Sequence, residues 1–281
     1  MGADMNAAGI ARRDAFLAAI RQAPVIMGIL NVTPDSFSDG GRHDAPDAAI
    51  AHAAAMVEAG AAIVDVGGES TRPGFDPVSE EEELRRTLPV VAALAESLDV
   101  PVSIDTYKAA VAREATRLGA VVVNDVWGLQ RDPAMPDTVA EAEAASIIMH
   151  NRVEIDGTID IIDDARRFFD RSLALAGGAG VPSERIILDP GIGFGKTFEQ
   201  NLECLRHMDR FLEYGLPLLL GLSRKSFIGR LLDRPVEERL AGTLAANVIG
   251  LARGASIIRV HDVAEHRDAL AVFRALRGSN E

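Results

Sequence analysis

Short hydrophobic segments alternate with longer amphipathic stretches along the chain. Eight of these segments are rich in Val, Ile and Leu, largely lack polar alternation, and mostly end at a polar residue. Strands buried on both faces, as in parallel sheets, have this composition. The predicted strands cover residues 25–31, 61–67, 100–105, 120–125, 145–150, 185–189, 217–223 and 255–261.

The stretches between these segments predict helices. Residues 46–59 place apolar side chains at helical spacing, and Ser79 with Glu82 forms a capping-box pattern that opens a helix reaching to about residue 98. A glycine just past a helix end is a common C-terminal signal. Five glycines precede predicted strands in this way: Gly60, Gly119, Gly180, Gly215 and Gly254.

Eight strand–helix units in roughly 250 residues predict a single (β/α)₈ barrel of the TIM type, in the α/β class. A doubly wound open sheet is the alternative, because an edge strand cannot be recognised from sequence. We expect residues 1–24 to form a short N-terminal extension and residues 25–281 to form the barrel domain.

Composition narrows the possible functions. With 42 acidic and 29 basic side chains the formal charge is −13, which disfavours general nucleic-acid binding. No apolar run approaches 18 residues and residues 1–23 lack an export signal, so we expect no membrane association and a cytoplasmic location. The single cysteine, Cys204, excludes an internal disulfide and an all-thiolate metal site.

Polar side chains gather at the predicted ends of the strands. The carboxyl ends of barrel strands carry the catalytic groups in TIM-barrel enzymes. Polar residues also end strands simply because loops begin there, but several here lie within apolar runs, where a polar group needs a partner. The strand ends carry Asn31, Asp65, Glu69, Asp105, Asn124, Asp125, His150, Asp189, Ser223, Arg224, Lys225, Arg259 and His261.

These side chains suggest a ligand. The carboxylates of Asp105 and Asp189 only accept hydrogen bonds, so with Asn124 they suit a flat heterocycle carrying several N–H donors. Lys225 can donate to a ring oxygen or nitrogen. Arg259 and His261 suit an anion such as phosphate. A structural ion pair inside the barrel, such as Asp189 with Lys225, is the alternative.

Seven segments stand out when they are read as whole strings: MGILNVTPDSFSDGG at 27–41, DVGGESTRPG at 65–74, SIDT at 103–106, VND at 123–125, DPGIGFGK at 189–196, SRKS at 223–226 and RVHD at 259–262. Together they resemble the dihydropteroate synthase family of folate biosynthesis. The resemblance implies a (β/α)₈ barrel that joins 6-hydroxymethyl-7,8-dihydropterin diphosphate to p-aminobenzoate with the help of Mg²⁺. The products are 7,8-dihydropteroate and pyrophosphate.

The resemblance also implies roles for residues of this chain. The pterin would be held by Asp105, Asn124, Asp189, Lys225 and Met149. The diphosphate would be bound by Asn31, Thr71, Arg72, Arg259 and His261, with Asn31 also coordinating Mg²⁺. The p-aminobenzoate would be enclosed by Phe37, Pro73, Phe194 and Ser226. The catalytic residues would be Lys225, Arg259, Asp105 and Asp35. The family further implies sulfonamide inhibitors and a homodimer.

The segment after the fifth strand departs from the family pattern. Many members read Met-His-Met-x-Gly-x-Pro, whereas this chain reads MHNRVEI at 149–155. Two other functions stay open. A folate-dependent corrinoid methyltransferase should lack the STRP and SRKS segments, and both are present. A non-catalytic pterin-binding paralogue should have lost Asn31, Lys225 or a loop motif, and none is lost.

Overall fold

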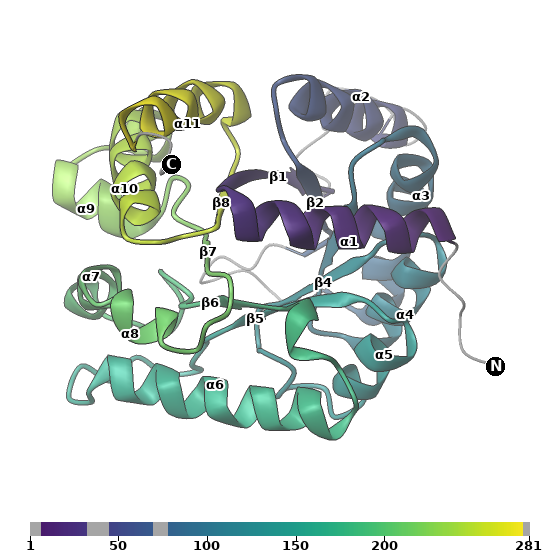
Figure 1. Ribbon diagram of the computed structural model, residues 1–281, viewed down its shortest axis with the longest axis horizontal. Coiled ribbons are helices and arrows are strands. Elements are labelled where there is room, and N and C mark those ends of the chain that lie inside the picture. Colours follow the sequence, from purple (N-terminus) through teal and green to yellow (C-terminus); the bar gives the residue numbers. More distant parts are fainter. Residues whose placement is uncertain (1–6, 33–44, 70–77, 278–281) are drawn as a thin grey trace.

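A computed structural model describes residues 7–32, 45–69 and 78–277, and its strands form a barrel (Figure 1). Every strand pairs in parallel with its neighbours, in the order β6-β5-β4-β3-β2-β1-β8-β7. The strands are β1 (Val25–Asn31), β2 (Ile63–Gly67), β3 (Val102–Asp105), β4 (Val122–Asp125), β5 (Ala145–Met149), β6 (Ile186–Asp189), β7 (Leu219–Leu220) and β8 (Ile257–Val260).

Helices surround the strands and cover their outer faces (Figure 1). Apolar side chains on the outer faces of the strands pack against these helices in one continuous core. The helices are α1 (Ala7–Gln22), α2 (Ala45–Glu58), α3 (Glu80–Ser97), α4 (Ala109–Arg117), α5 (Met135–Glu141), α6 (Ile161–Gly178), α7 (Phe198–Arg206), α8 (Asp209–Leu212), α9 (Ser226–Leu232), α10 (Leu240–Ala252) and α11 (Val263–Arg277).

The two ends of the strand order meet, which confirms the barrel and rules out the open sheet. Leu188 of β6 and Leu218 form a parallel bridge, and the Leu188 amide donates to the Pro217 carbonyl at 2.9 Å. This seam is narrow because β7 has only two residues, where seven were predicted. Pro217 has no amide hydrogen to add to the ladder, and the chain turns away after Leu220.

The helix-end signals were correct with one exception. Ser79 caps α3 by accepting a hydrogen bond from the Glu82 amide at 3.2 Å. The reciprocal half of the capping box is missing, because the Glu82 carboxylate binds Arg85 and Arg86 instead. All five glycines expected before strands have positive φ angles, between 68° and 109°.

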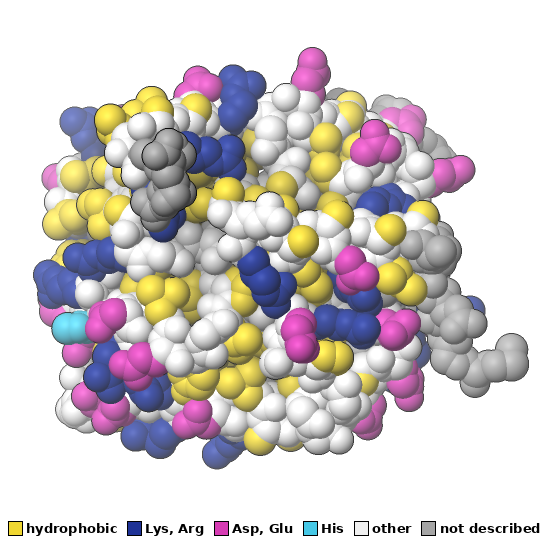
Figure 2. All heavy atoms as spheres, viewed as in Figure 1, with side chains coloured by type: hydrophobic (Ala, Val, Ile, Leu, Met, Phe, Trp, Pro, Cys, Tyr) yellow, Lys and Arg dark blue, Asp and Glu magenta, His cyan; other side chains and the backbone are white. Residues whose placement is uncertain are grey.

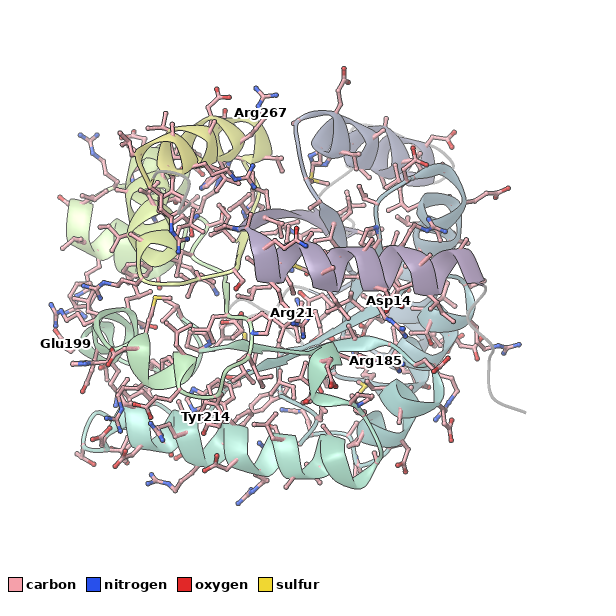
Figure 3. The ribbon with its side chains drawn as sticks, in the orientation of Figure 1. Asp14, Arg21, Arg185, Glu199, Tyr214 and Arg267 are labelled. Carbon is pink, nitrogen blue, oxygen red and sulfur yellow. The ribbon has the colours of Figure 1, made fainter. Side chains whose placement is uncertain are left out.

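The helix α1 closes the amino-terminal end of the barrel. Phe16, Leu17 and Ile20 of α1 are buried against the interior side chains of the strands. In Figures 1 and 3 this helix crosses in front of the strands, with Asp14 and Arg21 along it. Arg21 donates to the Glu184 carbonyl at 2.6 Å, which ties α1 to the segment before β6. A ligand must therefore enter from the opposite, carboxyl end.

Within the residues described, no helix is long and apolar enough to cross a membrane. The boundary predicted between the extension and the barrel domain, at residue 24, stays a prediction.

Candidate active site

The barrel interior changes from apolar to polar along the strands. Successive residues of a strand alternate between faces, so residues two apart point the same way. An apolar layer inside the barrel includes Ile63, Val122, Ile147, Ile187 and Ile257. Two residues further along the same strands come Asp65, Asn124, Met149, Asp189 and Arg259. At the carboxyl end of the barrel, a mainly polar layer of side chains therefore lies directly above an apolar layer.

Arg259 is the centre of this polar layer. Its Nε donates to Asp65 Oδ2 at 2.6 Å, and its Nη2 donates to Asp105 Oδ2 at 2.7 Å. Asn124 Nδ2 donates to the same oxygen of Asp65 at 3.0 Å. An ion pair inside the barrel therefore exists, but it joins Arg259 to two aspartates. Removing one partner of such a buried pair costs about 3–5 kcal/mol, so the arrangement is held firmly.

Asp189 and Lys225 face the same space without pairing. Asp189 Oδ1 accepts a hydrogen bond from the Gly191 amide at 2.7 Å. The Lys225 ammonium lies 3.8 Å from the centre of the Phe194 ring. Both residues belong to the part of the chain that the structure describes, and no contact of 4.0 Å or less joins their charged atoms. The structure therefore does not contain the Asp189–Lys225 ion pair that was the alternative to ligand binding, and Lys225 keeps donor capacity for a ligand.

Burial shifts the pKa values of these groups toward neutral pH. Burial raises the pKa of Asp189 to about 6, although the Gly191 amide and Lys225 oppose this. Burial lowers the pKa of Lys225 to about 7, against the attraction of Asp189. Burial also raises the pKa of Asp105, with Arg259 opposing it. Perturbed groups gathered at the carboxyl end of a barrel indicate a functional site.

Asp65 and Asp105 retain unused acceptors. Their Oδ1 atoms are buried and make no hydrogen bond within the described residues. The Asn31 Oδ1 and Asp105 Oδ2 atoms both lie near Gly67, each 3.8 Å from the point where a Cβ on that glycine would stand. An amide oxygen and a carboxylate oxygen thus lie beside the same glycine, which has no side chain to fill the space next to them.

The segments after β7 and β8 contact each other at two successive positions. Ser223 Oγ and His261 Nδ1 are 2.9 Å apart, and Arg224 binds Asp262 through both Nε and Nη2. Arg224 has a φ of 57°, a strained conformation for a side chain of this size. Ser226 is exposed and begins α9, directly after Lys225.

The atypical segment after β5 leaves Met149 at the site and turns His150 away. Met149 is buried, and its side chain lies beside Gly191. His150 is fully buried on the other side, with Nε2 3.1 Å from Asp164 Oδ2. Arg152 packs against Gly195, where a Cβ would come within 2.4 Å of it. The residues that depart from the family pattern therefore pack against the loop that follows β6.

Five of the predicted site residues lie outside the described residues: Asp35, Phe37, Thr71, Arg72 and Pro73. The two residues that flank positions 70–77 are described and are joined. Glu69 accepts a hydrogen bond from the Val78 amide at 3.3 Å and pairs with Lys108 at 2.6 Å. Lys108 also pairs with the buried Glu83. Neither Lys108 nor Glu83 was a candidate from the sequence, because nothing local to them indicates this cluster.

Asp65 was noted at a strand end but was not assigned to the site. The sequence contained one usable signal: Asp65 stands two residues after Ile63, so it had to point into the barrel. Lys196, which was part of a quoted motif without a role, is also buried at this end.

Comparisons with known proteins agree with this geometry. The family model described as "Pterin binding enzyme" matches residues 27–261. A dihydropteroate synthase from Clostridium beijerinckii is 50% identical over 251 residues, which cover 89% of this chain and 93% of that protein. A solved dihydropteroate synthase from Clostridium difficile, in the presence of pteroic acid, has a TM-score of 0.88 at 50% identity, covering 91% and 97%. One from Xanthomonas albilineans with 4-aminobenzoic acid has a TM-score of 0.88 at 44% identity, covering 91% and 94%.

The barrel and its polar carboxyl end are those of a pterin-binding enzyme. Within that class, the chain belongs to the dihydropteroate synthase family. The resemblance drawn from the motifs is confirmed, and the relatives are transferases of folate biosynthesis.

Proposed function

We propose that this chain condenses 6-hydroxymethyl-7,8-dihydropterin diphosphate with p-aminobenzoate, giving 7,8-dihydropteroate and pyrophosphate. The observation that carries the proposal is the polar layer itself. Asp105, Asn124 and Asp189 offer acceptors for ring N–H groups, and Lys225 offers a donor above the Phe194 ring. Family membership supplies the reaction, and the residue roles below are proposals.

The pterin lies within the polar layer, with Met149 beside it. Asp189 and the buried, unbonded Oδ1 of Asp105 accept its N–H groups, while Asn124 and Lys225 complete the hydrogen bonding. A hydrogen bond to a charged group contributes roughly 1.5–3 kcal/mol, so a few such contacts select the ring. Asp65 orients Asn124 and Arg259 from behind.

The chemistry breaks one bond and forms another at the pterin methylene carbon. The carbon–oxygen bond breaks, and its electron pair leaves with pyrophosphate. The aniline nitrogen then attacks the carbon and loses a proton. Carboxylates near the ring stabilise the positive charge that develops on the pterin. Within the described part of the chain, the Nη1 group of Arg259 makes no hydrogen bond, so it can bind the departing diphosphate together with His261, Thr71 and Arg72.

The p-aminobenzoate stacks beside Phe194 with its carboxylate at Ser226, and the family resemblance assigns Phe37 and Pro73 to the same substrate. The Xanthomonas albilineans relative was solved with 4-aminobenzoic acid, which supports this substrate. Sulfonamides resemble p-aminobenzoate in shape and charge, so they compete for the same place.

Mg²⁺ fits the residues at this end of the barrel. Mg²⁺ usually takes one or two protein oxygens and completes its shell with substrate phosphates and water. The Asn31 amide oxygen, with the Asp105 carboxylate near it, supplies such oxygens. Substrate phosphates and water would complete its coordination shell. When bound, the ion would offset the charge of the diphosphate.

Asn31→Ala should therefore lower turnover much more than it weakens binding of a pterin that lacks the diphosphate. We expect a loss of at least about tenfold in kcat/KM and a change of less than about twofold in the calorimetric Kd. A variant that kept wild-type turnover with unchanged Mg²⁺ dependence would remove Asn31 from the metal site.

We also propose a homodimer. An apolar groove between α10 and α11 is lined by Val248, Ala252, Ala269, Val272, Phe273, Leu276 and Arg277. Val272 and Leu276 are 60% and 83% exposed, and hydrophobic side chains are visible over these helices at the upper left of Figure 2.

The expected cytoplasmic location stays a prediction.

The test is pyrophosphate release by the purified chain with the pterin diphosphate and Mg²⁺, with and without p-aminobenzoate. We expect release to depend on p-aminobenzoate and to match the dihydropteroate formed. A non-catalytic paralogue would bind the pterin and release nothing. Transfer of a methyl group from a folate to a corrinoid protein, without condensation, would identify the methyltransferase instead.

A further inference from the structure

The chain uses arginine for nearly all of its cations. Its 29 basic side chains are 26 arginines and three lysines: Lys108, Lys196 and Lys225. None of the three is exposed, and each follows a strand at the carboxyl end of the barrel. Lysine carries a compact ammonium with three donors, whereas the arginine guanidinium is a planar fork. All three lysines therefore lie at the end of the barrel that carries the polar layer.

The clearest of these sites is Lys196, which is 5% exposed. Its ammonium donates to three backbone carbonyls: Gly191 at 2.8 Å, Phe194 at 3.1 Å and His150 at 3.4 Å. Three donors thus meet three acceptors, which compensates the cost of burying a charge. A guanidinium is too wide and too flat to meet three carbonyls that converge on one point.

The backbone around Lys196 is shaped to bring these carbonyls together. Gly191, Gly193 and Gly195 have φ angles of 65°, 86° and 56°, so every second residue of this turn is left-handed. A Cβ on Gly191 would stand 1.9 Å from the His150 carbonyl oxygen. The segment after β5 and the turn after β6 therefore meet at one buried cation.

This turn carries part of the proposed site. The Phe194 ring lies under the Lys225 ammonium at 3.8 Å. A Cβ on Gly193 would come within 3.0 Å of the Lys225 side chain, so the turn and Lys225 are in close contact. Any displacement of the turn would move the ring that is proposed to face p-aminobenzoate.

We propose that Lys196 is a positioning residue, whose ammonium fixes the 191–195 turn and so holds Phe194 in place for p-aminobenzoate. This proposal rests on the proposed function. Lys196 does not touch either substrate. Its effect falls on the turn and on Lys225 and Asp189, which contact the turn, whereas Asp105 and Asn124 are held on β3 and β4 by the Arg259–Asp65 network.

The experiment compares Lys196→Met, which removes the charge, with Lys196→Arg, which keeps the charge and changes the shape. We expect both variants to raise the KM for p-aminobenzoate at least about tenfold. The calorimetric Kd for a pterin without diphosphate should rise by a clearly smaller factor, because Asp105 and Asn124 are held independently of the turn. If Lys196→Met does not fold, the Arg variant is judged by the same criteria.

Arg13→Met is the matched control. Arg13 is a buried cation, 4% exposed, that binds the Glu143 carbonyl and Asp14 at the amino-terminal end of the barrel. We expect it to lower Tm and leave both constants unchanged. A folded Lys196 variant with wild-type KM, or full rescue by arginine, would overturn the proposal. Absent turnover in the wild type would instead overturn the proposed function, and titration of p-aminobenzoate with pterin, pyrophosphate and Mg²⁺ would still report on the turn.

Discussion

At the scale of single residues, the site depends on ionisable groups whose pKa values burial has shifted toward neutral pH. The pKa of Asp189 is raised to about 6 and that of Lys225 is lowered to about 7, both mainly by burial. The carboxylate form of Asp189 accepts pterin N–H groups, and the ammonium form of Lys225 donates most strongly. Both charged forms coexist in only a narrow pH window.

We therefore predict that the affinity for a pterin without diphosphate rises as the pH increases through about 6 and falls above about 7. Calorimetry from pH 5 to 9 would measure it. Lys225→Met should bind more weakly and lose the fall on the alkaline side, while the rise on the acid side remains. A wild-type affinity that stays flat from pH 5 to 9 would contradict the ionic assignment.

The same scale shows where sequence reasoning succeeded and failed. Asp105, Asn124 and Asp189 were predicted to meet because each ends a strand of a barrel, and the structure brings them to one end. The pairing of Arg259 with Asp65 was not predicted. These residues are 194 positions apart and meet only because β2 and β8 both flank β1. A local pattern carries no information about such a pair.

At the scale of elements, the apolar runs located the strands and the glycines located several helix ends. The predicted first strand, 25–31, agrees with β1 at both ends. The others were predicted one to five residues too long, because neither apolar runs nor the polar residues that bound them mark where the ladder hydrogen bonds stop. The role of α1 was missed, because its sequence alone did not show that Phe16 and its neighbours seal the barrel.

That role gives a prediction at the same scale. Phe16 is 4% exposed, and the apolar layer of the barrel separates it from the polar layer. Phe16→Ala should lower the free energy of unfolding by about 3–5 kcal/mol. Because the polar layer is held by its own ion pairs, the pterin Kd should stay within about twofold. Denaturant unfolding and calorimetry measure the two quantities. A large loss of affinity in a folded variant would mean that the two ends of the barrel are coupled.

At the scale of the whole molecule, the surface formed by α10 and α11 is apolar and lies apart from the carboxyl end of the barrel. The apolar groove and the exposed Val272 and Leu276 form an apolar surface patch on these two helices. A second copy of the chain would bury this patch about a twofold axis, since identical surfaces meet in such dimers. The patch lies on the outer helices, so association need not obstruct entry at the carboxyl end.

We predict that the wild type is a dimer by light scattering and that Val272→Glu is a monomer. Val272 is exposed in the single chain, so glutamate is tolerated there, but a dimer would bury the carboxylate without a partner at a cost of several kcal/mol. Ala264→Glu adds the same charge at an exposed position two turns earlier on α11, outside the groove, and should remain a dimer. A monomeric wild type, or a Val272→Glu variant that stays dimeric, would place the interface elsewhere or remove it. A monomeric Val272→Glu variant with wild-type kcat would show that each barrel works alone.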